Sequence, residues 1–145
     1  MKYNYNDGGR ADAGYKGRTG DCGTRAIAIA TGLAYQDVYD MVIEYASKER
    51  TGKRKKKISH PRTGIYVNTM KKILADLGWK WKATMGIGTG CTVHLNPSEL
   101  PSGNIICRVS RHYVAMIGGV VNDTYDCTRD KKRCVYGYWY KEDKK

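Results

Sequence analysis

Phenylalanine is absent from this chain, and only 3 of its 145 residues are proline. The 12 tyrosines and 3 tryptophans must therefore supply the bulky aromatic packing, and each brings a polar group with it. No apolar run approaches the roughly 18 residues that a transmembrane helix needs, and the N-terminal stretch MKYNYNDGGR has no apolar signal-peptide core. We therefore expect a soluble, cytoplasmic protein without a membrane partner.

Acidic residues are few, with 14 Asp and Glu against 26 Lys and Arg, and the formal net charge is +12. Such a charge favours an acidic partner, for which nucleic acid and an acidic protein surface are both candidates. The apolar fraction of 41% lies in the globular range and argues against global disorder. A chain of this length fits one domain with a core of its own, so we expect residues 1–145 to form a single domain.

Cysteine pairs at metal-binding spacing are also missing. The chain has 5 cysteines, an odd number, and no two of them form a C-x-x-C pair. Disulfide frameworks are typical of small secreted chains, and a zinc site needs four ligands, which this sequence does not group together. We therefore expect no disulfide framework, no metal and no organic cofactor. The cysteines are Cys22, Cys91, Cys107, Cys127 and Cys134.

Helical patterns fill the first half of the chain, and strand patterns fill the second. The Ala- and Ile-rich stretch that begins at about Cys22 predicts a short helix, and Gly32 ends this helix as its C-cap. Residues 35–49 and 66–79 carry apolar side chains at helical spacing, which predicts two amphipathic helices. Short β-rich runs follow at 79–84, 91–95, 104–110, 112–117, 120–126 and 134–140. This order predicts an α+β fold, with N-terminal helices packed on an antiparallel β-sheet.

A basic segment at about residues 50–64 separates the second and third predicted helices. It contains a proline, two glycines and five consecutive basic residues, so we expect an exposed loop. Such a run is typical of a patch that binds nucleic acid or an acidic protein, and it also occurs in loops that are merely solvated. The five candidate binding residues are Lys53, Arg54, Lys55, Lys56 and Lys57.

Cys22 opens the first predicted helix, in the stretch TGDCGTRAIAIATG. At a helix N-terminus the unpaired N–H groups and the helix dipole favour a thiolate and lower the pKa of the thiol. The same N–H groups can face an oxyanion, and Gly20 and Gly23 leave the surroundings uncrowded. Cys22 is thus a candidate nucleophile, although a packed core thiol gives the same local pattern.

A cysteine nucleophile needs a histidine base, and the chain has three histidines. His60 lies in the basic loop, where a solvated residue is the simpler interpretation. His94 lies in a possible strand with no partner visible in the sequence. His112 begins HYVAMIGGVVNDTYD, which predicts a β-hairpin that turns at Gly118-Gly119.

The length of the hairpin loop decides which polar residue accompanies His112. A two-residue loop pairs Ile117 with Val120 and places Asp123 on the same face as His112. A three-residue loop reverses the faces and selects Asp126 or Asn122 instead. Of these we favour Asp123, while a surface histidine without a catalytic role remains the alternative for His112.

Together these segments resemble the papain-like cysteine peptidases, and most closely the small branch that is similar to bacteriocin-leader peptidases, where DCG also opens the nucleophile helix. The chain further resembles a group of phage and bacterial proteins in the stretches DCGTRAIAIATG, LGWKW, HYVAMIGGVVNDTYD and CVYGYW, over about residues 18 to 140. The resemblance implies a papain-like fold and a phage- or mobile-element-encoded cysteine hydrolase of the thiol peptidase type. Its substrate would be a protein or peptide, cut at a peptide, isopeptide or side-chain amide bond.

Carried over by position, the resemblance makes Cys22 the nucleophile and His112 the general base and later the acid. Asp123 then holds the imidazole in the required tautomer. One position departs from the pattern, since papain-like enzymes usually place a Gln about six residues before the cysteine as an oxyanion donor. Here that residue is Lys16.

The missing glutamine leaves open which group donates to the oxyanion and whether the chain is catalytically active. Asn4, Asn6 or the region of Lys16 and Arg18 can supply the absent donor in principle. A second hypothesis is a basic nucleic-acid-binding accessory protein that uses the Lys53–Lys57 loop, with Cys22 only structural. A third is a catalytically inactive papain-like module that serves protein interaction.

Overall fold

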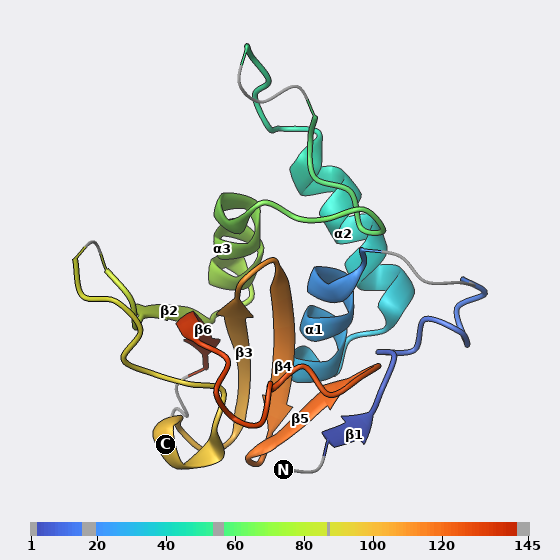
Figure 1. Ribbon diagram of the computed structural model, residues 1–145. Helices are drawn as coiled ribbons and strands as arrows, with labels where there is room; N and C mark the ends of the chain where they lie inside the picture. Colours follow the sequence, from blue (N-terminus) through green and yellow to red (C-terminus); the bar gives the residue numbers. More distant parts are fainter. Residues whose placement is uncertain (1–2, 16–19, 54–56, 87, 142–145) are drawn as a thin grey trace.

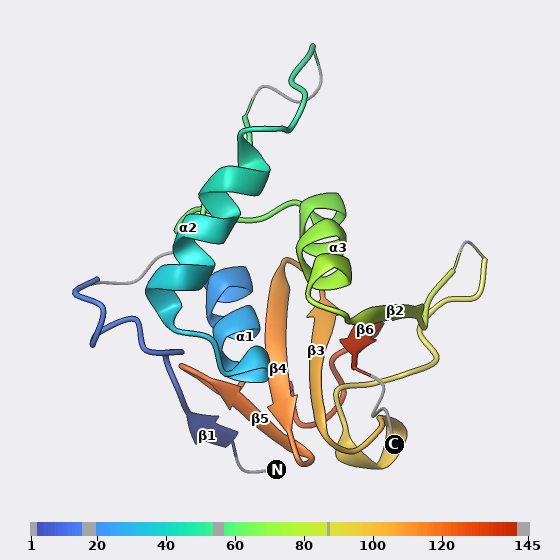
Figure 2. The ribbon, with the colours of Figure 1, turned by 180° about the vertical axis from the view of Figure 1, so that it is seen from behind.

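The computed structural model describes residues 3–15, 20–53, 57–86 and 88–141. Within these residues three α-helices pack on a mixed six-stranded sheet, which confirms the predicted α+β class (Figure 1). Helices α1 and α3 contact the sheet, and α2 packs against both of them on the side away from it (Figure 2). None of the helices in this part of the chain combines the length and the apolar character needed to cross a membrane.

The three helices lie within the segments predicted for them. Helix α1 spans Cys22–Thr31, and Gly32 follows it with a φ of 77°, the left-handed C-cap that glycine adopts without strain. Helix α2 spans Tyr35–Ala46, and helix α3 spans Val67–Asp76. The described parts of the basic segment, residues 50–53 and 57–64, contain no α-helix and no strand of the sheet, and residues 50–53 project beyond the end of α2 (Figure 1).

The sheet has the strand order β1-β5-β4-β3-β6-β2. Its strands are β1 (Tyr3–Tyr5), β2 (Lys80–Ala83), β3 (Asn104–Val109), β4 (His112–Ile117), β5 (Val120–Asp123) and β6 (Val135–Tyr140). All neighbours are antiparallel except β1, which pairs with β5 in parallel, so the expected antiparallel sheet is wrong at this edge. All three helices lie between β1 and β5 in the chain, which gives the long connection that parallel pairing requires.

Residues 91–95 do not form the strand that their pattern predicts. They make one isolated bridge, between His94 and Cys134. The apolar pattern of this stretch reflects core packing, because Leu95 is fully buried and packs on the sheet face opposite the helices.

Two apolar clusters cover the two faces of the sheet. The first joins α1, α2 and α3 to Ile106, Ala115 and Trp139 on the strands. The second contains Ile105, Val114 and other strand residues, and it is covered by the loops before β3 and β6. Strand β4 contributes side chains to both clusters, so packing on both faces of the sheet holds it in place. His112, the first residue of β4, is therefore held by a well-packed strand.

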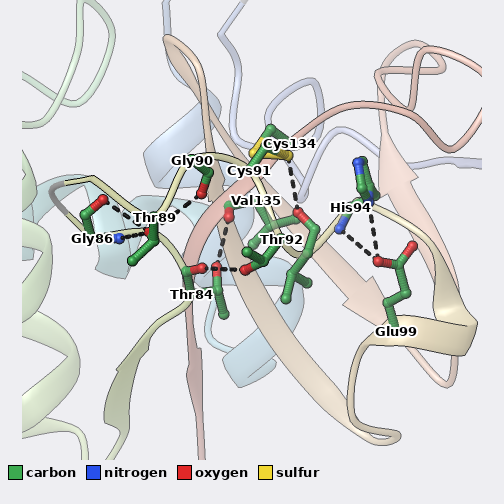
Figure 3. The surroundings of a disulfide bond; sticks show 11 residues. Thr84, Gly86, Thr89, Gly90, Cys91, Thr92, His94, Glu99, Cys134 and Val135 are labelled. Carbon is green, nitrogen blue, oxygen red and sulfur yellow. Dashed lines mark hydrogen bonds and ion pairs between the residues drawn. A yellow bond between two sulfur atoms is a disulfide. The ribbon is translucent and has the colours of Figure 1, made fainter.

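A disulfide joins Cys91 to Cys134 across 43 residues, although the sequence led us to expect no disulfide framework (Figure 3). The bridge lies where the loop after β2 passes the start of β6, with a Cα–Cα distance of 5.8 Å. Thr84 donates to the carbonyl of Val135 at 2.6 Å, and Thr92 donates to the carbonyl of Thr84 at 2.9 Å. The tertiary fold therefore brings together two cysteines whose spacing in sequence carries no such signal.

Candidate active site

Cys22 is the first residue of α1 and is partly accessible to solvent. The side chain of the preceding Asp21 does not cap the helix, and it turns instead to Arg10, Arg25 and Tyr35. The first N–H groups of α1 therefore donate no hydrogen bond to the side chain of Asp21, and they lie at the helix end that carries the thiol. This is the arrangement in which a helix N-terminus stabilises a thiolate or an oxyanion.

His112 and Asp123 meet across the β4–β5 hairpin. Ile117 pairs with Val120 around Gly118-Gly119, which confirms the predicted two-residue loop. This register places the two side chains on one face, and His112 Nε2 lies 2.6 Å from Asp123 Oδ2. Both residues are buried, at 8% and 1% exposed, so water does not compete strongly for this hydrogen bond.

The Cys22 thiol and the His112 imidazole interact, and each shifts the pKa of the other. Burial alone would raise the pKa of the Cys22 thiol, but the hydrogen bond and positive charge of His112 lower it below its ordinary value of 9.0. The backbone N–H of Tyr113 and the charge of Arg25 lower it further.

The pKa of the His112 imidazole shifts in the opposite direction to that of the thiol. Burial alone would lower the pKa of His112, but its hydrogen bonds to Asp123, Cys127 and Cys22 raise it to about 12. A lowered thiol pKa and a raised imidazole pKa together favour the thiolate–imidazolium pair. Asp123 remains ionised beside it: burial alone would raise the pKa of its carboxyl, and His112 and Arg25 lower it below 3.8.

Arg25 is a member of the site that the sequence did not indicate. Its Nη1 lies 2.5 Å from Asp123 Oδ1, and its Nε lies 2.9 Å from Asp21 Oδ1. The guanidinium thus holds the oxygen of Asp123 that His112 does not use. The one available signal was a charged residue inside the otherwise apolar run of α1, where it must be buried and paired.

The alternative partners for His112 are occupied elsewhere. The side-chain oxygen of Asn122 accepts from the amides of Asn4 and Asn6, at 2.8 and 3.3 Å. Asp126 accepts from the hydroxyl and the backbone N–H of Thr128. Asn4 and Asn6 are therefore bound to the β5 edge and do not line the cleft at Cys22, while Lys16 and Arg18 lie outside the described residues.

The other two histidines have local partners. His60 Nδ1 accepts from the backbone N–H of Arg62 at 3.1 Å. His94 Nδ1 lies 3.1 Å from Oε1 of Glu99, the last residue of the short 3-10 helix Pro97–Glu99 that precedes β3 (Figure 3). Neither residue lines the cleft that contains Cys22.

Cys127 is a second thiol at the site and, unlike Cys22, it is buried. Its sulfur, His112 and Asp123 offer ligand atoms within 4.8 Å of one another, a group that could hold a metal ion. His112 Nε2 and Asp123 Oδ2 are, however, at hydrogen-bond distance from each other, whereas ligands of one zinc ion spread apart around it. We therefore interpret Cys127 as a neighbour that contacts the imidazole.

A cleft of about 270 Å³ opens at Cys22 and His112. Residues 63–65 form one wall, held to α1 by the hydrogen bond from Thr24 to Pro61 and to β4 by that from Tyr113 to Ile65. A Cβ on Gly20 would lie 3.1 Å from the carbonyl oxygen of Thr63, so glycine here allows this close approach. The lining residues are Gly20, Cys22, Thr63, Gly64, Ile65, Arg108, Val109, Arg111, His112 and Tyr113.

The structure describes two of the five residues of the predicted basic patch. Lys53 and Lys57 are exposed on the projecting loop, and Arg54, Lys55 and Lys56 lie outside the described residues. Lys57 lines a hollow of about 370 Å³ that shares residues 63–65 with the cleft at Cys22. This end of the loop therefore lies next to the candidate site.

Comparison of the chain with protein-family models, with curated proteins and with solved structures gives no match.

Proposed function

We propose that this protein is a papain-like cysteine hydrolase of the thiol peptidase type, which cleaves a peptide, isopeptide or side-chain amide bond. The observation that carries the proposal is the continuous chain of contacts from Cys22 to His112 to Asp123 at the mouth of a cleft. A nucleophile at a helix N-terminus, a base on a strand and a buried orienting carboxylate together fulfil the requirements of nucleophilic catalysis. A merely packed thiol does not require the other two groups.

Acylation begins from the thiolate–imidazolium pair. The Cys22 thiolate attacks the carbonyl carbon of the substrate, and the negative charge moves to the carbonyl oxygen. In this proposal the backbone N–H groups at the start of α1, which the Asp21 side chain does not cap, stabilise the oxyanion. The carbon–nitrogen bond then breaks, His112 gives its proton to the leaving nitrogen, and a thioester to Cys22 remains.

Deacylation uses the neutral imidazole that the first step leaves. His112 takes a proton from water as the water oxygen attacks the thioester carbon. The carbon–sulfur bond breaks, the carboxylic acid leaves, and the thiolate–imidazolium pair is restored. Asp123 keeps Nε2 protonated throughout, so that Nδ1 is the nitrogen that exchanges protons with the thiol and the substrate.

Cleavage of a proteome-derived peptide mixture tests this proposal. Tryptic peptides with blocked amino termini are incubated with the wild type, Cys22→Ala and His112→Ala, and new amino termini are identified by mass spectrometry. Release of ammonia from the same mixture reports side-chain amide hydrolysis. We expect products with the wild type alone. Products that persist in Cys22→Ala, or the absence of any Cys22-dependent product, would overturn the proposal.

A further inference from the structure

Two arginines line the cleft beside the nucleophile. Arg108 lies near the end of β3, opposite Tyr113 of β4, and Arg111 lies in the turn that joins these strands, directly before His112. Both guanidinium groups therefore come from the same hairpin end that carries the candidate base. No Asp or Glu is among the residues that line this cleft.

Neither arginine is neutralised by a carboxylate in the part of the chain that the structure describes. Within the described residues, no carboxylate forms an ion pair with Arg108 or Arg111. Arg25 and Arg10, by contrast, are both paired with Asp21. The Arg108 guanidinium lies over the ring of Tyr136, at 5.4 Å from its centroid, and a contact with a ring face leaves its N–H groups able to donate to a ligand.

The backbone at Arg111 adds a second observation. Its φ is 56°, in the left-handed region where glycine is the residue without strain. Arg111 is exposed and lines the cleft. The turn that contains it is stabilised by Arg133, which donates to the carbonyl of Ser110 at 2.5 Å. An arginine thus occupies a turn position that its backbone disfavours, next to the candidate active site.

We propose that Arg108 and Arg111 form a carboxylate-binding subsite that selects an acidic group of the substrate next to the scissile bond. The inference rests on the proposed function. Guanidinium groups bind carboxylates through charge-assisted and often bidentate hydrogen bonds. The cleft, at about 270 Å³, is at the small end of ligand pockets, so it fits a short peptide segment. The carboxylate is that of an Asp or Glu side chain or of a chain terminus.

Matched pairs of thiol-alkylating reagents test this subsite and distinguish the two sources. Acetyl-glutamyl and acetyl-glutaminyl chloromethyl ketone differ only in a side-chain carboxylate or amide. Bromoacetylglycine and bromoacetylglycinamide differ only in a terminal carboxylate or amide. Mass spectrometry gives the rate of alkylation of Cys22 by each reagent, and the anionic-to-neutral ratio within one variant cancels any change in thiol reactivity.

The variants are Arg108→Gln and Arg111→Gly, and the latter removes the side chain while relieving the backbone. The matched control is Arg129→Gly, because Arg129 is exposed, has a φ of 50° and does not line the cleft. We expect the wild type and the control to react about tenfold faster with the anionic member of one pair. We expect the anionic-to-neutral ratio of alkylation rates to fall toward one in Arg108→Gln, in Arg111→Gly or in both.

Two results would overturn the subsite: ratios near one for both pairs in the wild type, or a preference that persists in both cleft variants. The proposed function is judged separately, from the rate of the neutral reagent iodoacetamide with the wild type and His112→Ala. If that rate depends on His112 while the ratios are flat, only the carboxylate inference fails. If it does not depend on His112, the proposed function fails.

Discussion

Arg25 Nη1 lies 2.5 Å from Asp123 Oδ1, while the other carboxylate oxygen of Asp123 lies 2.6 Å from His112 Nε2. The carboxylate is thus held from both sides, by the nucleophile helix and by the strand that carries the base. Because Arg25 is three residues after Cys22 on α1, this ion pair also fixes the helix relative to the hairpin. The positions of the thiol and the imidazole are therefore coupled through Asp123.

Replacement of Arg25 tests this coupling. Arg25→Gln leaves the buried carboxylates of Asp21 and Asp123 without their shared cation, so we expect the free energy of unfolding to fall by about 3 kcal/mol. Urea denaturation measures the change, with Arg50→Gln as the control because Arg50 is exposed. Equal stability of the two variants would contradict a structural role for the ion pair.

The pH dependence of stability should reveal Asp123. Its pKa is lower in the folded protein than the ordinary 3.8, so the stability it contributes is present above about pH 4 and is lost as the pH falls through the folded value. We expect the wild type to lose more unfolding free energy than Asp123→Asn between about pH 5 and pH 2. Parallel curves for the two proteins would contradict the lowered pKa.

The disulfide gives a redox-dependent prediction. Under oxidising conditions we expect the double variant Cys91→Ser, Cys134→Ser to be less stable than the wild type by about 3 kcal/mol, because the bridge restricts the unfolded chain. With excess reductant the difference should shrink. Peptide mapping without reduction should recover Cys91 linked to Cys134, and recovery of both as free thiols would refute the bridge.

Gly137 gives a packing prediction. An added Cβ would overlap the ring of Trp81 and would lie 2.9 Å from the carbonyl oxygen of Lys82 on the neighbouring strand β2. We expect Gly137→Ala to cost about 1–3 kcal/mol of unfolding free energy through overpacking. Gly52→Ala, at a position with no neighbouring atom within 4 Å, is the control and should change stability little.

The sequence was most informative where one local feature determined geometry. The Gly118-Gly119 pair predicted the hairpin loop, and the loop alone selected Asp123 over Asn122 and Asp126, since a shift of one residue exchanges the two faces. The apolar spacing likewise predicted the three helices within a few residues.

Long-range relations were not predictable from local pattern. The parallel pairing of β1 involves three exposed residues with no distinctive alternation, and the Cys91–Cys134 bridge joins cysteines that only the folded sheet brings together. Arg25 was missed for the same reason, because its partner Asp123 is 98 residues away in the chain. Residues 91–95 were predicted to form a strand because of their apolar pattern. In the structure their apolar side chains instead pack a loop against the sheet.

The most direct test is the pH dependence of alkylation of Cys22 by iodoacetamide, in the wild type and in His112→Ala, with the modified residue identified by mass spectrometry. We predict fast labelling of the wild type at pH 6, because His112 lowers the pKa of the Cys22 thiol, and loss of that labelling in the variant. If both proteins instead label with a midpoint near an ordinary thiol pKa of about 8.5, Cys22 is not an activated nucleophile and the account is wrong.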